Sequence, residues 1–163
     1  MRVIRVITTA AALAATLAVA APARADIVPP RPFYADSGDN CVYGYTNGDL
    51  LWVTPGPLPP ITVNVTGSVV DRPTPTDPRA CRDDGFSSTA TFTAYSGTVV
   101  VGSQAVRADN GQVRFQFSLG TNRPGAPVSH LVVQVCRDPL VTLPPSYCGR
   151  AVTYRPTSIT PTA

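Results

Sequence analysis

Apolar and polar residues alternate with a period of two along much of the chain. The pattern covers residues 61–66 and returns over residues 89–94 and 130–136. Such alternation is typical of a strand that buries one face and exposes the other. A shorter segment of the same kind predicts a last strand over residues 151–154.

A turn signal lies at Asn47-Gly48, between two apolar segments. This dipeptide favours a two-residue hairpin turn, which would pair Tyr45 with Leu50 and Tyr43 with Trp52. One face of the hairpin would then be aromatic and the other aliphatic.

Two further turns are predicted at Ser96-Gly97 and Asn110-Gly111. The second turn would pair Val106 with Phe115 in an antiparallel hairpin. The first turn places odd-numbered residues of the shared strand in the core, whereas the second places even-numbered residues there. We therefore expect a β-bulge near Gly102, because one extra residue reverses the alternation.

The fold class expected is all-β, an antiparallel sandwich of about eight strands that is immunoglobulin-like in the broad sense. The chain has no lysine and no glutamate and is rich in valine and threonine, which favours strands over helices. Residues 26–40 are expected to form an extended N-terminal arm, residues 41–155 the sandwich domain and residues 156–163 a flexible tail. The prolines of residues 72–80 predict a surface loop.

The first 25 residues have the features of a signal peptide. Arg2 and Arg5 precede an apolar run over residues 10–21, and Ala23-Arg24-Ala25 is a small-x-small cleavage signal. Residues 1–25 are therefore expected to be removed, and the mature protein to be secreted into the extracellular space.

Removal of this segment also changes the charge balance. The chain has 13 Arg and Lys residues in total, and loss of the three leader arginines leaves 10 to balance 10 aspartates. The remaining arginines are scattered along the sequence, which argues against nucleic-acid binding. The apolar run is shorter than the roughly 20 residues that a membrane-spanning helix needs, so we expect no membrane span.

Four cysteines in an exported chain predict two disulfides, for which three pairings exist. We favour Cys41 with Cys81 and Cys136 with Cys148. The second pair would close a short loop that is rich in proline.

The first of these disulfides would bring acidic residues together. Asp36, Asp39 and Asn40 would approach Asp83 and Asp84, and several oxygen ligands could then hold a structural calcium ion. A solvated turn is the alternative interpretation, because Asp side chains commonly bond to the nearby backbone. No other cofactor is expected.

The second disulfide would present residues 137–147 as a stiff loop, as in secreted protease inhibitors. Thr142, Leu143 and Pro144 are the candidate contact residues. A plain structural loop is the alternative.

Tyr43, Tyr45 and Trp52 are candidate binding residues, because aromatic rings on a strand face stack on sugars or anchor a protein partner. Packing in the core is the alternative. Catalysis is not expected: His130 is the single histidine, and no Gly-x-Ser-x-Gly motif accompanies it.

Several segments resemble uncharacterised secreted proteins of GC-rich actinobacteria. The resemblance covers most of the chain after the leader and implies an exported domain that retains its cysteines, without implying an activity. The function expected is a non-enzymatic binding module for a protein partner or a cell-wall glycan; a protease inhibitor and a hydrolase are the other two hypotheses. The segments are Cys-Val-Tyr-Gly (41–44), Val-Val-Asp-Arg-Pro (69–73), Cys-Arg-Asp-Asp-Gly (81–85), Val-Val-Gln-Val-Cys-Arg (132–137) and Pro-Pro-Ser-Tyr-Cys-Gly (144–149).

Overall fold

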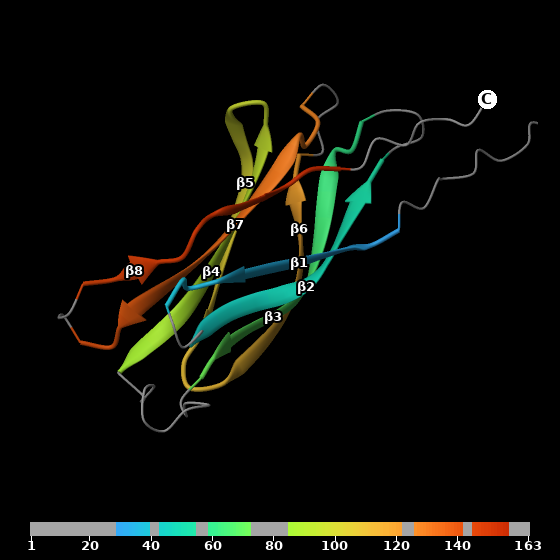
Figure 1. Cartoon of the computed structure of the whole chain (residues 1–163). Coiled ribbons are helices and arrows are strands. Elements are labelled where there is room, and N and C mark those ends of the chain that lie inside the picture. Colours follow the sequence, from blue (N-terminus) through green and yellow to red (C-terminus); the bar gives the residue numbers. More distant parts are fainter. Residues whose placement is uncertain are drawn as a thin grey trace, which may run out of the picture.

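The chain forms two antiparallel β-sheets that pack face to face (Figure 1). The computed structural model describes residues 29–39, 43–54, 59–72, 85–121, 126–141 and 145–156. Sheet 1 has the strand order β1-β2-β3-β6, and sheet 2 has the order β5-β4-β7-β8, with β9 also paired to β7. The strands are β1 (Arg31–Asp36), β2 (Gly44–Val53), β3 (Thr62–Asp71), β4 (Phe86–Ser96), β5 (Val99–Ala108), β6 (Gln112–Gly120), β7 (His130–Pro139), β8 (Tyr147–Cys148) and β9 (Val152–Tyr154). The predicted all-β antiparallel sandwich is confirmed.

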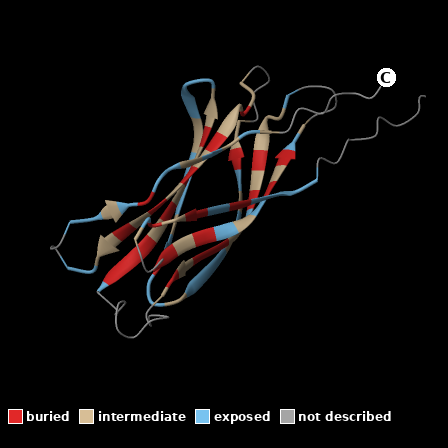
Figure 2. Ribbon diagram, in the orientation of Figure 1, coloured by how far each residue is buried: buried red, intermediate tan, exposed pale blue. Residues whose placement is uncertain are grey.

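The core lies between the two sheets, where alternate residues of β1, β2, β3, β4 and β7 are buried (Figure 2). Phe92 lies near its centre, and its ring meets those of Phe33, Phe115 and Phe117 edge-on at centroid distances of 5.7, 5.1 and 5.2 Å. Such contacts add about 0.5–1.5 kcal/mol per pair to the burial energy. Alternation predicted the buried positions of β3, β4 and β7 correctly, and these include Val63, Val65, Ala90, Phe92, Ala94, Leu131, Val133 and Val135.

The hairpin expected at Asn47-Gly48 is wrong. Residues 44–53 form one continuous strand, in which Asn47 pairs with Ser68 and Gly48 with Gly67 of β3. A Cβ atom on Gly48 would lie 2.0 Å from the Thr66 carbonyl oxygen. This glycine therefore permits a close approach of two strands, and the local turn signal was outweighed by pairing with both β1 and β3.

The expected N-terminal arm also needs correction, because Arg31–Asp36 within it form edge strand β1. The prolines of residues 26–40 argued against a strand in this segment. Pro32 is nevertheless tolerated in β1, because edge strands leave part of their backbone unpaired. The hydroxyl of Tyr154 in β9 fastens this edge to sheet 2. It accepts a hydrogen bond from Tyr34 N at 2.9 Å and donates one to Tyr34 O at 2.7 Å.

The turn at Asn110-Gly111 is present, but the hairpin expected around it is wrong. β5 belongs to sheet 2, whereas β6 belongs to sheet 1 and pairs with β3. Asn110 has a positive φ of 48°, so the chain does turn here, and Asp71 accepts a hydrogen bond from its amide. Val106 and Phe115 both pack against the core without pairing.

The bulge expected near Gly102 is confirmed. Ala94 pairs with Gly102, whereas the next residue, Tyr95, pairs with Val100, so Val101 is the extra residue. The turn after Ser96 is confirmed as well, since Ser96 pairs with Val99.

Cys136 and Cys148 form the predicted disulfide between β7 and β8. The expected Cys41–Cys81 disulfide and the signal peptide over residues 1–25 lie outside the described residues, as do most of the loop expected over residues 72–80 and the tail after residue 156. In the part of the chain that the structure describes, no helix has the length and apolar character to cross a membrane.

Candidate functional site

The three aromatic residues expected on one surface are separated by the fold. Trp52 and Tyr43 are only 3% and 7% exposed. Because β2 is one strand and not a hairpin, Trp52 faces the core, whereas Tyr45 is on the opposite, outer face of sheet 1. The core interpretation therefore holds for Trp52 and Tyr43, and only Tyr45 is left as a candidate surface contact.

Strand register places polar side chains in rows across the outer face of sheet 1. Residue pairing between neighbouring strands aligns Tyr34 of β1, Asn47 of β2, Ser68 of β3 and Arg114 of β6. We call this the central row. The two adjacent rows are Asp36, Tyr45, Val70 and Gln112 on one side, and Pro32, Asp49, Thr66 and Gln116 on the other.

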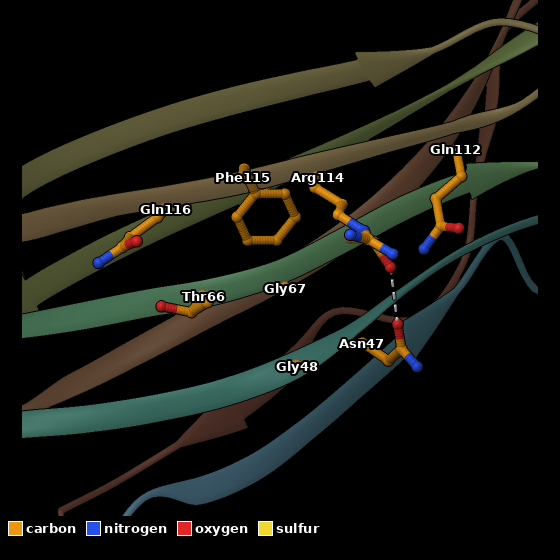
Figure 3. Close-up of a pocket in the computed structure, with 9 residues that line it drawn as sticks. Asn47, Gly48, Thr66, Gly67, Gln112, Arg114, Phe115 and Gln116 are labelled. Atoms are coloured by element: carbon orange, nitrogen blue, oxygen red, sulfur yellow. Dashed lines mark hydrogen bonds between the residues drawn. The ribbon is translucent and has the colours of Figure 1, made fainter.

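A hollow of about 560 Å³ lies along these rows over β2, β3 and β6 (Figure 3). Gly48 and Gly67 pair at its floor, which is formed by backbone. Its walls are mostly amide, hydroxyl and guanidinium side chains. The lining residues are Asn47, Gly48, Thr66, Gly67, Ser68, Gln112, Arg114, Phe115 and Gln116.

Most hydrogen-bonding groups around the hollow are unused. Ser68 Oγ donates to Asn47 Oδ1 at 3.1 Å, and the Asn47 amide nitrogen points away from this bond (Figure 3). Within the described chain, the exposed side chains of Gln112, Arg114 and Gln116 make no hydrogen bond or ion pair. The site can therefore both donate and accept hydrogen bonds to a bound molecule.

Two tyrosine rings stack beside the hollow. Tyr34 and Tyr45 have centroids 6.2 Å apart with 28° between their planes, and the Arg72 guanidinium lies 5.1 Å from the Tyr45 centroid. Tyr34 is 47% exposed. Partial burial, and then the negative charge of Asp36, raise the pKa of Tyr34 above its ordinary value of 10.0, so its hydroxyl is protonated at neutral pH.

A second polar cluster is buried between the sheets at one end of the sandwich. Asp71 of β3 lies 3.4 Å from the Arg137 guanidinium of β7, and both side chains are 1% exposed. Asp71 also accepts hydrogen bonds from Ser88 Oγ at 2.5 Å and from the Asn110 amide at 2.9 Å. The guanidinium lies 4.9 Å from the Tyr43 ring centroid. This cluster joins the two sheets and is buried from solvent, so it is not a binding surface.

The expected calcium ligands lie only partly within the described residues. Asp36 accepts a hydrogen bond from the Gly38 amide at 3.0 Å, and Asp39 accepts bonds from Ser37 Oγ and from the Tyr43 amide at 3.1 Å. These two carboxylates thus bond to the local turn. The other candidates, Asn40, Asp83 and Asp84, lie outside the described residues, within which no group of three His, Cys or acidic side chains gathers.

His130 lies on the outer face of sheet 2, where its ring stacks on Tyr95 with centroids 4.8 Å apart. Its Nδ1 is 2.9 Å from Ser129 Oγ, a group that also donates to the Tyr95 carbonyl at 3.0 Å and accepts from the Gly97 amide. Desolvation, and then the charge of Arg155, lower the pKa of His130 below 6.5. Ser129 is thereby occupied in holding the β4–β5 turn.

The candidate inhibitor residues Thr142, Leu143 and Pro144 lie outside the described residues. The two residues before them are at the surface, since Leu140 is 46% and Val141 69% exposed. The disulfide between Cys136 and Cys148 closes the loop that contains them.

Sequence reasoning named none of Gln112, Arg114 and Gln116 as candidate binding residues, although they lie on the exposed face of β6. It did not connect them with Asn47 or Ser68, because the β2–β3–β6 pairing joins residues far apart in the chain and no local signal reports it. Comparisons with protein-family models, with curated proteins and with solved structures found no match for this chain.

Proposed function

We propose that this protein is a secreted, non-enzymatic binding module that holds a carbohydrate on the outer face of sheet 1. The observation that carries the proposal is the hollow over β2, β3 and β6, whose polar walls stand next to the stacked Tyr34–Tyr45 pair.

The chemistry of this face suits a sugar. Each hydroxyl of a sugar both donates and accepts a hydrogen bond, and the amides of Asn47, Gln112 and Gln116 offer both functions. The C–H faces of sugar rings pack on aromatic rings, and Tyr34 presents one to solvent. A protein partner would favour a broad apolar centre with a polar rim, whereas six of the seven side chains that line the hollow are polar and Phe115 is the exception.

Two features support export to an extracellular location. The sequence begins with a basic segment, an apolar run and an Ala-x-Ala signal. Cys136 and Cys148 form a disulfide, which is typical of oxidising compartments. The resemblance to secreted actinobacterial proteins points the same way, and a component of the cell wall or a glycan of the surroundings is then within reach.

The test is a glycan array followed by titration calorimetry on any hit, with the mature chain and three variants. Tyr34→Ala, Asn47→Ala and Arg114→Ala alter the proposed site, and Arg107→Ala on β5 of sheet 2 is the matched control for an exposed arginine. We expect the three site variants to lose about 1–2 kcal/mol of binding energy each, as for hydrogen bonds to charged groups and aromatic contacts. Equal binding by Arg107→Ala and the three site variants would remove the proposed site.

The disulfide-closed loop supports a second candidate function, inhibition of a protease. Leu140 and Val141 are exposed beside the covalent closure of this loop, as an inhibitor contact requires. Titration of subtilisin-like and trypsin-like proteases with the protein tests this directly. Stoichiometric inhibition that is lost in a Leu143→Asp variant would support it, and cleavage of the loop without inhibition would exclude it.

A further inference from the structure

We infer that the carbohydrate lies across the strands of sheet 1, as an internal segment of a linear, uncharged glycan. This inference rests on the proposed function and adds the ligand's direction, shape and charge.

The direction follows from the register. Tyr34, Asn47, Ser68 and Arg114 face each other on four successive strands, so their side chains form a line perpendicular to the strands. Neighbouring strands are about 4.8 Å apart, which gives the central row a length of about 14 Å between backbones. One sugar ring of a linear chain is close in length to one strand interval, so successive rings can meet equivalent positions on successive strands.

The shape follows from the ends of the row. Among the strands that the structure describes, β1 and β6 are the two edges of sheet 1. A chain that lies on the central row can therefore continue past Tyr34 at one edge and past Arg114 at the other. A site for a terminal sugar would need a closed wall at one end, and no described strand of sheet 1 supplies one there.

The chemistry along the row changes in step with the strands. The Tyr34 ring, backed by Tyr45, offers a stacking surface at the β1 edge. The middle offers the amide of Asn47, the Ser68 hydroxyl and the bare backbone at Gly67, where a ring can approach the sheet closely. The β6 edge offers three long donors on consecutive outward positions, Gln112, Arg114 and Gln116.

The charge follows from the groups on this face. Asp36 and Asp49 stand on the two rows that flank the central row, and Arg114 and Arg72 are the cations near them. Two negative and two positive groups cancel, so the described part of the face has no net attraction for a polyanion or a polycation. Among linear glycans, this balance favours an uncharged chain.

The test is titration calorimetry with β-1,4-linked gluco-, N-acetylgluco- and xylo-oligosaccharides, each from the monosaccharide to the hexamer. For the series that binds, we expect affinity to rise with each added ring and to become constant once the chain spans the row. Oligogalacturonates of matched length should bind more weakly than the neutral series.

Variants at the two ends of the row sharpen the result. Tyr34→Ala and Arg114→Ala should each lower the affinity for the longest oligomers about three- to tenfold. The shortest oligomer that binds should contact only one end of the row, so the variant at the opposite end should leave its affinity almost unchanged. Tyr34→Ala is a suitable variant for this test, because Tyr154 hydrogen-bonds to the Tyr34 backbone and not to its ring. Arg107→Ala should match the unmodified protein.

Each outcome decides a different statement. Tight binding of a monosaccharide, or loss of binding when the oligosaccharide ends are blocked, would overturn the internal-segment inference while the proposed function stands. Stronger binding of oligogalacturonates would overturn the uncharged ligand. Binding by none of these glycans would overturn this inference, whereas the proposed function is decided separately by the glycan array.

Discussion

At the scale of single residues, the most consequential contact is the buried pair of Asp71 and Arg137. It links β3 of one sheet to β7 of the other, and Ser88 and the Asn110 amide complete the hydrogen bonds of the carboxylate. A buried pair contributes little relative to apolar residues, but loss of one partner leaves an unpaired charge in a buried site.

We therefore predict that Asp71→Ala lowers the free energy of unfolding by about 3–5 kcal/mol. Urea denaturation followed by fluorescence measures this change. Asp49→Ala is the control, because Asp49 is exposed on the outer face of β2 and its loss should cost less than about 0.5 kcal/mol. Similar midpoints for both variants would mean that the pair does not hold the sheets together.

A second residue-scale prediction concerns His130. Desolvation and the charge of Arg155 lower its pKa below 6.5, so the folded protein favours the neutral ring. The unfolded chain binds the proton more readily, and stability is therefore lost as pH falls from about 6.5 through the lower pKa of the folded state. Proton NMR of the imidazole should give the lowered pKa, and His130→Gln should remove this part of the acid loss. A pKa of 6.5 or above would contradict the prediction.

At the scale of elements, the glycine pair in β2 and β3 explains a failed prediction. Asn47-Gly48 has the composition of a hairpin turn, but Gly48 faces Gly67 in the middle of two long strands. Phe33 lies beside Gly48 and Phe115 beside Gly67, so one row of the inner face reads Phe, Gly, Gly, Phe. The glycines admit close strand approach where the neighbouring rings take up the space.

A side chain at Gly67 should thus disturb the sheet. A Cβ atom there would lie 2.2 Å from the Asn47 carbonyl oxygen, so Gly67→Ala should destabilise the fold by about 1–3 kcal/mol. It should also weaken glycan binding, because Asn47 lines the hollow. Gly111→Ala is the matched control, since its nearest contact would be Asp109 O at 3.8 Å. Thermal denaturation of the two variants should give a lower melting temperature for Gly67→Ala than for Gly111→Ala. Equal melting temperatures would refute the packing argument.

Alternation within single strands could be predicted from the sequence, whereas the pairing between strands could not. Alternation within a strand depends on local contacts with one core, which is why the buried positions of β3, β4 and β7 were predictable. The bulge near Gly102 was predicted from the opposite parity of two turns, and the extra residue is Val101. Pairing depends on partners elsewhere in the chain. The turn at Asn110-Gly111 was correctly placed, but it leads from sheet 2 to sheet 1, and nothing in its residues distinguishes such a crossing from a hairpin.

At the scale of the whole molecule, composition and alternation were enough to predict a sandwich, because a chain so poor in helix formers has few other ways to bury alternating valines. The site could not be predicted in the same way. Asn47, Ser68 and Arg114 come from three strands, and only the strand order brings them into one row. The aromatic candidates were judged from a hairpin that does not form, so a surface position and a core position both stayed open for Trp52, which lies in the core.

The strand order also predicts that stability and binding can be separated. The disulfide between Cys136 and Cys148 joins β7 and β8 in sheet 2, whereas the proposed site is on the outer face of sheet 1. The two cysteines are 12 residues apart, and opening a loop of this size costs about 3 kcal/mol. The double variant Cys136→Ser with Cys148→Ser should therefore unfold at lower urea concentration but, below its transition, bind the glycan with unchanged affinity. A folded double variant with weakened binding would show that sheet 2 shapes the site, and the outer face of sheet 1 could then no longer be treated as a self-contained surface.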